Sequence, residues 1–350
     1  MPDSKHYEDF VAWTKQLPTA ESPAWSGLPL NVERLNRIKQ AGSLIANANL
    51  LQGTDEDELA GAGSAADGSG GRAKWLVSLQ KKVSGFYDLL PAELQTLQRA
   101  GSAVKNPLFR FLERECSVLS ALLQTVRTDL EMVLEMCAGE RKSTNHIKAL
   151  AQGLHADVVP RHWKKYVVPE AMTSAEWLSD FARRVDQLKK LAGSTDHGRS
   201  GIWFGGLLSP EAYLIATQQA TAQEHAWSLE ELELKLSIDP SAEEQQRALD
   251  EQTGFIIHGL SIESAEFDRE ERRIRLSSKL ASSLPTIILT WAKTEPQAAG
   301  DDAPASRSKD VVELPLYLTR NRKNLVCAVK LPSYGVAAHA WYQSGVALFA

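Results

Sequence analysis

Hydrophobic residues recur at two different spacings along the chain, and the spacing changes near residue 201. Before this point, apolar positions are three or four residues apart, which is the period of a helix with one buried face. From Leu232 to Ile238 they alternate with polar residues, which is the period of a half-buried strand. The pattern predicts an α+β fold with an N-terminal helical part that contains one long helix, followed by a C-terminal antiparallel β-barrel or sandwich.

The helical part contains several segments with this spacing. Helices are predicted around Tyr7–Trp13, from Asn31 to Leu50, over Trp75–Leu90, in a short stretch from Pro91 to Leu97, over Pro107–Cys137, around Ile147–Leu154 and from Thr173 to Leu191. The longest follows Asn106, a residue suited to an N-cap, and stops at Gly139. About 31 residues at ~1.5 Å each give a rod of roughly 45 Å. Such a rod suits a crossing between modules of a larger assembly, and the spacing equally allows one helix of an ordinary antiparallel bundle.

Two helix starts carry clear local signals. Thr173 and Glu176 have the spacing of a capping box. Ser209 offers an N-cap hydroxyl, Pro210 fits the first helical position, and Glu211 suits the positive end of the helix dipole. We therefore expect a further helix that starts at Pro210 and runs toward Trp227.

The chain beyond this helix is predicted to be mostly β-structure. Candidate strands are Leu232–Ile238, Phe255–Ile262, Ile274–Leu276, Ile287–Trp291, Val311–Leu318, Leu325–Leu331 and Gly345–Phe349. No crossover helix is evident between them, which favours an antiparallel sheet. Pro315 predicts that its strand lies at an edge or carries a bulge. The composition of Thr54–Gly71 and Glu295–Lys309 predicts flexible segments.

Composition and charge narrow the classes of protein. The 350 residues are 43% hydrophobic and 24% charged, as in soluble globular proteins, and the net charge is -5. This balance provides no basic field for nucleic acid or anionic lipid. No apolar run approaches the roughly 18 residues that span a bilayer, so we expect a cytoplasmic protein. Cys116, Cys137 and Cys327 are widely spaced among apolar residues and are predicted to be reduced core thiols.

Motifs for catalysis or metal binding are absent from the sequence. It has no phosphate-binding loop, no His-Glu-x-x-His, no Gly-x-Ser-x-Gly and no paired cysteines. His155 and His162 have no cysteine or carboxylate at ligand spacing, and nothing places a nucleophile beside His258 or His339. We therefore predict no catalytic, cofactor-binding or metal-ligating residue.

Several segments carry a resemblance to a known family. They are PEAYLIATQQATAQEHAWSLEELELKL from Pro210, GFIIHGLSIESAEF from Gly254, Leu284-Pro285, Leu314–Leu318 and Trp341–Leu348. In this order they resemble the C-terminal region of dynein heavy chains, and they look closer to the cytoplasmic than to the axonemal branch. Upstream, Leu28–Glu33 is similar to the segment that ends the helical lid of the last AAA+ module in these motors.

The resemblance implies a division of the chain. Residues 1–40 would be the end of the last AAA+ helical lid, 41–200 the helical part of the dynein C-terminal domain with a flexible insert at 54–71, and 201–350 its β-rich barrel part. Because the sequence would begin with a partial module, we expect it to be a piece of a longer polypeptide.

The resemblance also implies a function. The protein would be the non-catalytic C-terminal domain of a cytoplasmic dynein heavy chain, packing on the AAA+ ring and tuning an ATP-driven, minus-end-directed microtubule motor. ATP and Mg²⁺ would bind upstream modules and no cofactor would bind here. Partners would be the AAA+ modules of the same polypeptide, the dynein intermediate, light intermediate and light chains, and microtubules, with no nucleic acid and no membrane.

Two alternatives belong to other classes of protein. The protein would be a free-standing interaction module if its β-barrel binds a peptide or protein by itself. It would be an enzyme if a cleft with convergent titratable groups lies at the helix/barrel junction, near Trp203–Pro210.

Overall fold

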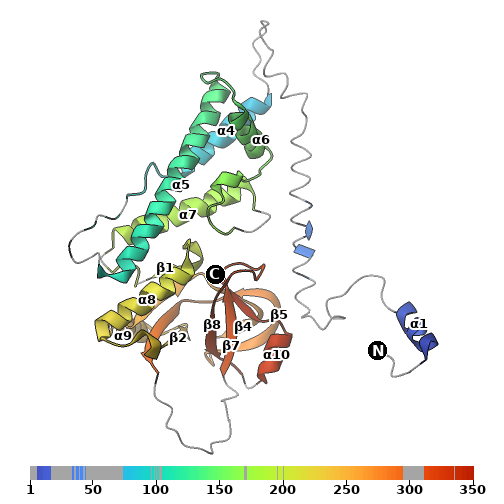
Figure 1. Cartoon of the computed structure of the whole chain (residues 1–350), viewed down its shortest axis with the longest axis vertical. Coiled ribbons are helices and arrows are strands. Elements are labelled where there is room, and N and C mark those ends of the chain that lie inside the picture. Colours follow the sequence, from blue (N-terminus) through green and yellow to red (C-terminus); the bar gives the residue numbers. More distant parts are fainter. Residues whose placement is uncertain are drawn as a thin grey trace, which may run out of the picture.

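Helices gather at one end of the molecule and strands at the other. The computed structural model describes residues 6–16, 74–168, 172–194, 196–199, 201–294, 311–334 and 336–350, without 96, 98, 100 and 102–104, and also residues 34, 37, 38, 40, 41 and 44. Within these ranges, α8 (Pro210–His225) lies between the helical part and the strands (Figure 1). The segments Thr54–Gly71 and Glu295–Lys309, and most of the predicted helix from Asn31 to Leu50, lie outside the described residues.

The helical part is built around one long helix, as predicted. The bounds are α4 Lys74–Leu89, α5 Pro107–Ala138, α6 Asn145–His155, the 3₁₀ turn η4 Arg161–Trp163 and α7 Ser174–Ala192. A separate helix, α1 Tyr7–Lys15, buries no residue. With 32 residues, α5 is about 48 Å long at ~1.5 Å per residue. Helices α4, α6 and α7 pack against its buried stripe (Figure 1).

Both ends of α5 have the predicted caps. The Asn106 side chain accepts a hydrogen bond from the Leu108 N–H at 2.9 Å, and Pro107 occupies the first turn. At the other end Gly139 has a φ of 83°, in the left-handed region that glycine tolerates. Local sequence therefore fixes the length of this helix.

The helix α7 also begins as predicted. The Glu176 N–H donates to Thr173 Oγ1 at 3.2 Å, and the Thr173 N–H donates back to Glu176 Oε2 at 2.9 Å. These two bonds form the capping box and satisfy two N–H groups at the start of the helix.

The prediction of a short helix from Pro91 to Leu97 is wrong, because the described part of this segment is not helical. Arg127 Nη1 donates to the carbonyl oxygens of Leu90 at 2.9 Å and Pro91 at 3.2 Å, and Ser120 Oγ donates to Leu94 O at 3.2 Å. In a helix these carbonyls would accept from N–H groups four residues later. Side chains of α5 satisfy them instead.

The second part of the molecule has nine strands and several helical elements among the described residues. Their bounds are β1 Ile202–Trp203, η5 Phe204–Gly206, α8 Pro210–His225, η6 Leu229–Glu231, β2 Leu232–Ile238, α9 Ala242–Asp250, β3 Gly254–His258, β4 Ser261–Asp268, β5 Arg273–Ser283, β6 Ile287–Lys293, β7 Val311–Tyr317, β8 Leu325–Pro332, α10 Ala338–Gln343 and β9 Ala347–Phe349. The sequence analysis did not predict the short helices α9 and α10, which lie between strands. Neither helix was evident from apolar spacing, since α9 has no buried residue and α10 buries only Trp341.

The strands form two sheets of order β1-β3-β6-β2 and β5-β4-β9-β7-β8. Most neighbours are antiparallel, as predicted, but β1 with β3 and β7 with β9 are parallel. The edges of the five-stranded sheet approach at an isolated bridge, where the Tyr334 N–H donates to Ile274 O at 3.2 Å. This bridge does not close the sheet into a barrel. The arrangement is sandwich-like, and the barrel form of the prediction is not confirmed.

The predicted strand Phe255–Ile262 is two strands in the structure. β3 ends at His258 in the first sheet, and β4 starts at Ser261 in the second. Gly259 lies between them with a φ of 89°, and a Cβ there would lie 2.4 Å from Trp203 Cδ1. The glycine permits both the turn and the close approach of the indole, which an uninterrupted apolar run does not reveal.

Pro315 lies beside a bulge, which is one of the two predicted settings. The register of β7 and β8 shifts between Leu316 and Tyr317. Tyr317 O accepts from the Ala350 N–H at 3.0 Å, so the backbone of Tyr317 faces β9. Backbone groups of residues two apart in a strand point to the same side, so the backbone of Pro315 also faces β9. The N–H that proline lacks would therefore not have bonded to β8.

We predict that Arg127→Ala destabilises the helical part by about 1.5–3 kcal/mol, because it removes charged hydrogen bonds to two carbonyl oxygens. It also removes the guanidinium that lies 4.0 Å from the centroid of the Tyr87 ring. The free energy of unfolding in urea measures the change. The control is Arg110→Ala on the exposed face of α5, expected within about 0.5 kcal/mol of wild type. Equal unfolding midpoints for the two variants would contradict this prediction.

Candidate functional site at the junction of the helical and β parts

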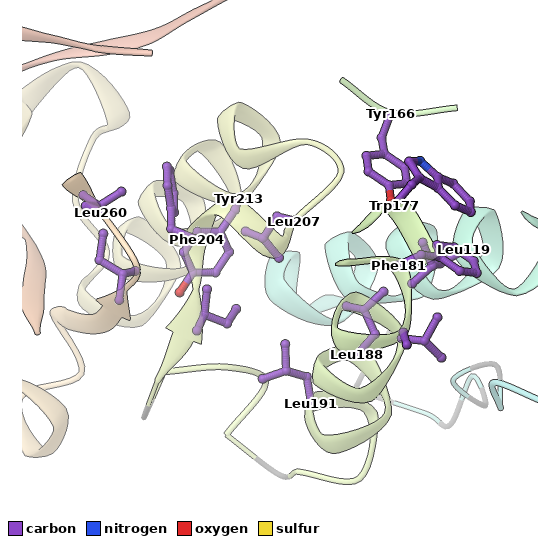
Figure 2. Packing of buried hydrophobic residues seen from close by; sticks show 14 of the residues in the cluster. Leu119, Tyr166, Trp177, Phe181, Leu188, Leu191, Phe204, Leu207, Tyr213 and Leu260 are labelled. Carbon is purple, nitrogen blue, oxygen red and sulfur yellow. The ribbon is translucent and has the colours of Figure 1, made fainter. Parts of the chain in front are cut away.

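Tyr213 of α8 lies at the centre of the junction between the two parts. Its side chain is fully buried, and its hydroxyl donates to Gly198 O at 3.2 Å. The Tyr213 ring contacts one ring each from α5, η5 and β3, which belong to Phe111 (5.5 Å between centroids), Phe204 (6.3 Å) and Phe255 (6.4 Å). In Figure 2, Leu207 lies between Tyr213 and Phe181 of α7. The helices and the sheets therefore share one hydrophobic core.

The polar side chains that α8 buries are all hydrogen-bonded. Thr217 Oγ1 donates to Leu214 O at 2.7 Å and accepts from the indole N–H of Trp291 on β6 at 2.9 Å. Thr221 Oγ1 donates to Thr217 O at 3.1 Å. Burial of these hydroxyls therefore costs little, and the bond to Trp291 joins α8 to the four-stranded sheet.

A buried carboxylate of α5 joins the long helix to the start of α8. Glu115 is 3% exposed, and its two oxygens accept from the N–H groups of Leu208 at 2.7 Å and Ser209 at 3.1 Å. Burial raises the pKa of Glu115, and the two backbone bonds oppose this rise. The prediction that the Ser209 hydroxyl caps α8 is wrong, since Ser209 makes no side-chain cap bond. The carboxylate of Glu115 lies at this positive helix end instead.

Arg184 of α7 makes a second polar connection at the junction. This residue is 8% exposed, and its Nε donates to Asp180 Oδ2 at 2.6 Å. Its Nη1 donates to Leu207 O at 3.1 Å, and its guanidinium lies 4.5 Å from the centroid of the Tyr166 ring. The buried cation is thus paired, hydrogen-bonded and stacked, and it joins α7 to the turn before α8.

The glycines around Trp203 make room for its indole. Gln187 of α7 accepts from the Trp203 N–H at 2.7 Å and donates to Trp203 O at 3.1 Å. Arg183 lies 4.3 Å from the ring centroid. A Cβ at Gly206 would lie 2.3 Å from Trp203 Cε3. The described residues between Trp203 and Leu207 therefore pack closely around the indole.

A second cluster lies farther along α5, where three segments meet. The carboxylate of Asp129 accepts from the Trp163 indole N–H at 2.6 Å and lies 2.5 Å from His162 Nε2. His146 Nε2 of α6 is 3.5 Å from the other carboxylate oxygen. Sequence spacing missed this carboxylate partner of His162, because α5 and η4 are separated by the whole of α6. The only signal in the sequence was an acidic residue among the apolar positions of a long helix.

The other histidines considered from the sequence lie elsewhere. His155 is in the last turn of α6, with its ring centroid 6.0 Å from that of Trp75. His258 is exposed at the end of β3, and His339 lies in α10 rather than in a loop. That these residues have ordinary packing or surface roles stays a prediction.

The cysteines are reduced, as expected. None of the three forms a disulfide, and Cys116 and Cys137 are buried, whereas Cys327 is only partly buried. Burial raises the pKa of the Cys116 and Cys327 thiols to about 11, so both are protonated at neutral pH. In the part of the sequence that the structure describes, no helix is both long and apolar enough to cross a membrane.

Comparison with known proteins shows the family of this chain. Residues 38–350 match the family model of the C-terminal domain of dynein heavy chains. The chain belongs to this family. The resemblance predicted from the sequence segments is therefore confirmed, and the junction and the α5 cluster are features of a dynein C-terminal domain.

The branch of the dynein family follows from the relatives. This dynein domain is 36% identical to the cytoplasmic dynein heavy chain of Paramecium tetraurelia, over 99% of this chain and 7% of that protein. It is 34% identical to the cytoplasmic dynein heavy chain of Drosophila melanogaster, over 99% of this chain and 8% of that protein. A ciliary dynein beta chain of Heliocidaris crassispina is 24% identical, over 99% of this chain and 7% of that protein. The predicted closeness to the cytoplasmic branch is confirmed, and the chain spans only 7 to 8% of the length of these cytoplasmic relatives.

We predict that Glu115→Ala lowers the free energy of unfolding by about 1–3 kcal/mol, because the N–H groups of Leu208 and Ser209 lose their shared acceptor. Glu113→Ala is the matched control on the same helix. Its carboxylate pairs with the solvent-exposed Arg99, so the unfolding midpoint should stay close to that of wild type. Urea denaturation measures both variants. A Glu115→Ala midpoint equal to that of Glu113→Ala would show that the carboxylate does not stabilise the junction.

We predict that Gly206→Ala destabilises the domain by about 1–3 kcal/mol, because the added Cβ overlaps the Trp203 ring. Gly85→Ala in α4 is the matched control. A Cβ there meets no atom within 4 Å, and alanine favours the helix, so this variant should gain about 0.5–1 kcal/mol. Thermal unfolding of both proteins distinguishes the effects, and the prediction is wrong if Gly206→Ala melts at or above the wild-type temperature.

Proposed function

We propose that the protein is the non-catalytic C-terminal domain of a cytoplasmic dynein heavy chain, which packs on the AAA+ ring and tunes the mechanics of the motor. The observation that carries the proposal is the match to the dynein C-terminal domain family over residues 38–350, together with the higher identity to cytoplasmic than to ciliary chains. A domain of this kind acts by contact, so its stiffness and its surfaces determine its effect.

The junction supports a mechanical role. Glu115, Arg184 and Tyr213 connect α5, α7 and α8 through buried hydrogen bonds and ring contacts. Interiors packed in this way transmit displacement because they resist compression. A rod of about 48 Å that is fixed to a β part transfers movement at one end to the other. This property suits a domain that couples or restrains modules of a ring.

The proposal extends to the parent polypeptide. ATP and Mg²⁺ would bind upstream modules, and the motor would move toward the minus ends of microtubules in the cytoplasm. Its partners would be the AAA+ modules of the same heavy chain and the dynein intermediate, light intermediate and light chains. Residues 1–40 would complete the last AAA+ lid, and the start of the family match at residue 38 supports this boundary.

The test uses the parent heavy chain in a single-molecule motility assay. We compare the wild-type motor with Glu115→Ala, which loosens the junction, with Glu113→Ala as the control, and with a deletion of Leu232–Ala350. We expect Glu115→Ala and the deletion to change stall force or run length, while nucleotide binding stays intact and the control matches wild type. Equal stall force and run length in all four motors would reject a tuning role.

An immunoblot of native extract tests the interaction-module alternative. An antibody raised against residues 72–350 should detect a polypeptide far larger than 38.5 kDa that sediments with microtubules and is released by ATP. A band near 38.5 kDa would instead support a free-standing interaction module.

A further inference from the structure

Three segments of the helical part bring metal-ligating side chains together. Asp129 comes from α5, His146 from the first turn of α6, and His162 from η4. One ligand atom from each lies within 4.8 Å of the other two. The imidazole rings of the two histidines have their centroids 5.6 Å apart. This cluster lies outside the junction.

The donor atoms are of the type that zinc prefers. Imidazole nitrogen and carboxylate oxygen bind Zn²⁺ at about 2.0–2.2 Å, so two ligands in a tetrahedron are about 3.3–3.5 Å apart. His146 Nε2 and Asp129 Oδ1 are 3.5 Å apart, which already fits this spacing. His162 Nε2 lies 2.5 Å from Asp129 Oδ2 and would have to exchange this hydrogen bond for the metal. Its side chain is 39% exposed and that of His146 is 56% exposed, so both rings have room to turn.

The carboxylate, in contrast, is held in place. The Asp129 side chain is only 6% exposed, and the indole N–H of Trp163 donates to its Oδ2 at 2.6 Å. The Trp163 side chain is fully buried and packs against Trp177, with ring centroids 5.4 Å apart and ring planes at 31°. A hydrogen bond from the protein to a ligating carboxylate orients it and contributes to metal affinity. The cluster therefore combines one fixed ligand with two adjustable ones.

We propose that Asp129, His146 and His162 form a binding site for Zn²⁺ or a chemically similar divalent transition metal. The three side chains supply the protein ligands, and water occupies the remaining coordination position. A bound ion joins α5, α6 and η4 at the end of the helical part away from α8. Because the ion binds the folded state preferentially, it stabilises this region.

The test is titration of the metal-free, untagged 350-residue protein with ZnCl₂ in a calorimeter, and with CoCl₂ in a visible spectrometer. Wild type should bind one ion per molecule, raise its melting temperature with Zn²⁺, and give the visible absorption of four-coordinate Co²⁺. His146→Ala and His162→Ala should each weaken Zn²⁺ binding by at least about 10-fold, because each removes a direct ligand. His155→Ala, on the same helix as His146 but outside the cluster, is the matched control and should bind like wild type.

A second variant separates metal ligation from packing. Trp163→Phe keeps an aromatic ring but removes the N–H that orients Asp129, so it should weaken Zn²⁺ binding by about 10-fold and keep one ion per molecule. The proposal is overturned if wild type binds no Zn²⁺. It is also overturned if the double variant His146→Ala/His162→Ala binds Zn²⁺ with wild-type affinity, or if His155→Ala loses as much affinity as the cluster variants.

Discussion

Burial of α8 on two sides is the constraint on which the rest of the structure depends. This helix lies between the helical part and the sheets, and its exposed side chains are Ile215, Gln219, Gln223 and Glu224, of which the first three lie along one stripe. Its buried side chains are mostly small or hydroxylated, apart from Tyr213 and Leu214, and this composition lets two layers approach it closely. The hydroxyls of Thr217 and Thr221 are hydrogen-bonded, which offsets the cost of removing them from water. One connected core across the two parts follows from this arrangement.

The long helix α5 provides a second organising element, because it carries two buried carboxylates. Glu115 accepts backbone N–H groups at the start of α8, and Asp129 accepts the indole N–H of Trp163. They are separated along the helix by about 21 Å at ~1.5 Å per residue. Each carboxylate connects α5 to a segment distant in sequence, so each helps to determine where that segment docks. The proposed metal site and the junction therefore lie on the same helix, with the junction nearer its N-terminal end and the metal site nearer its C-terminal end.

These connections suit the mechanical coupling that we propose for the domain. Arg184 and Gln187 place two polar links from α7 on the segment between Trp203 and Leu207, while Trp203 packs against glycine backbones. Hydrogen bonds in a dry, closely packed interior have little freedom to rearrange. In the proposed tuning role, this junction would be the part through which displacement passes between the helices and the sheets.

The sequence by itself determined the features that depend on neighbouring residues. Apolar spacing predicted α5 and β2, and the signals at Asn106, Gly139 and Thr173 located helix ends, because caps and amphipathic faces arise within a few residues. The tertiary structure alone decided the features that depend on distant partners. Side chains of α5 satisfy the carbonyls after Leu90 and replace a predicted helix, and the indole of Trp203 meets the turn at Gly259 where one predicted strand becomes two. The Glu115 contacts and the histidine cluster around Asp129 likewise form only after folding, since hydrogen bonds and metal-ligand geometry depend on distance in space, which sequence spacing does not encode.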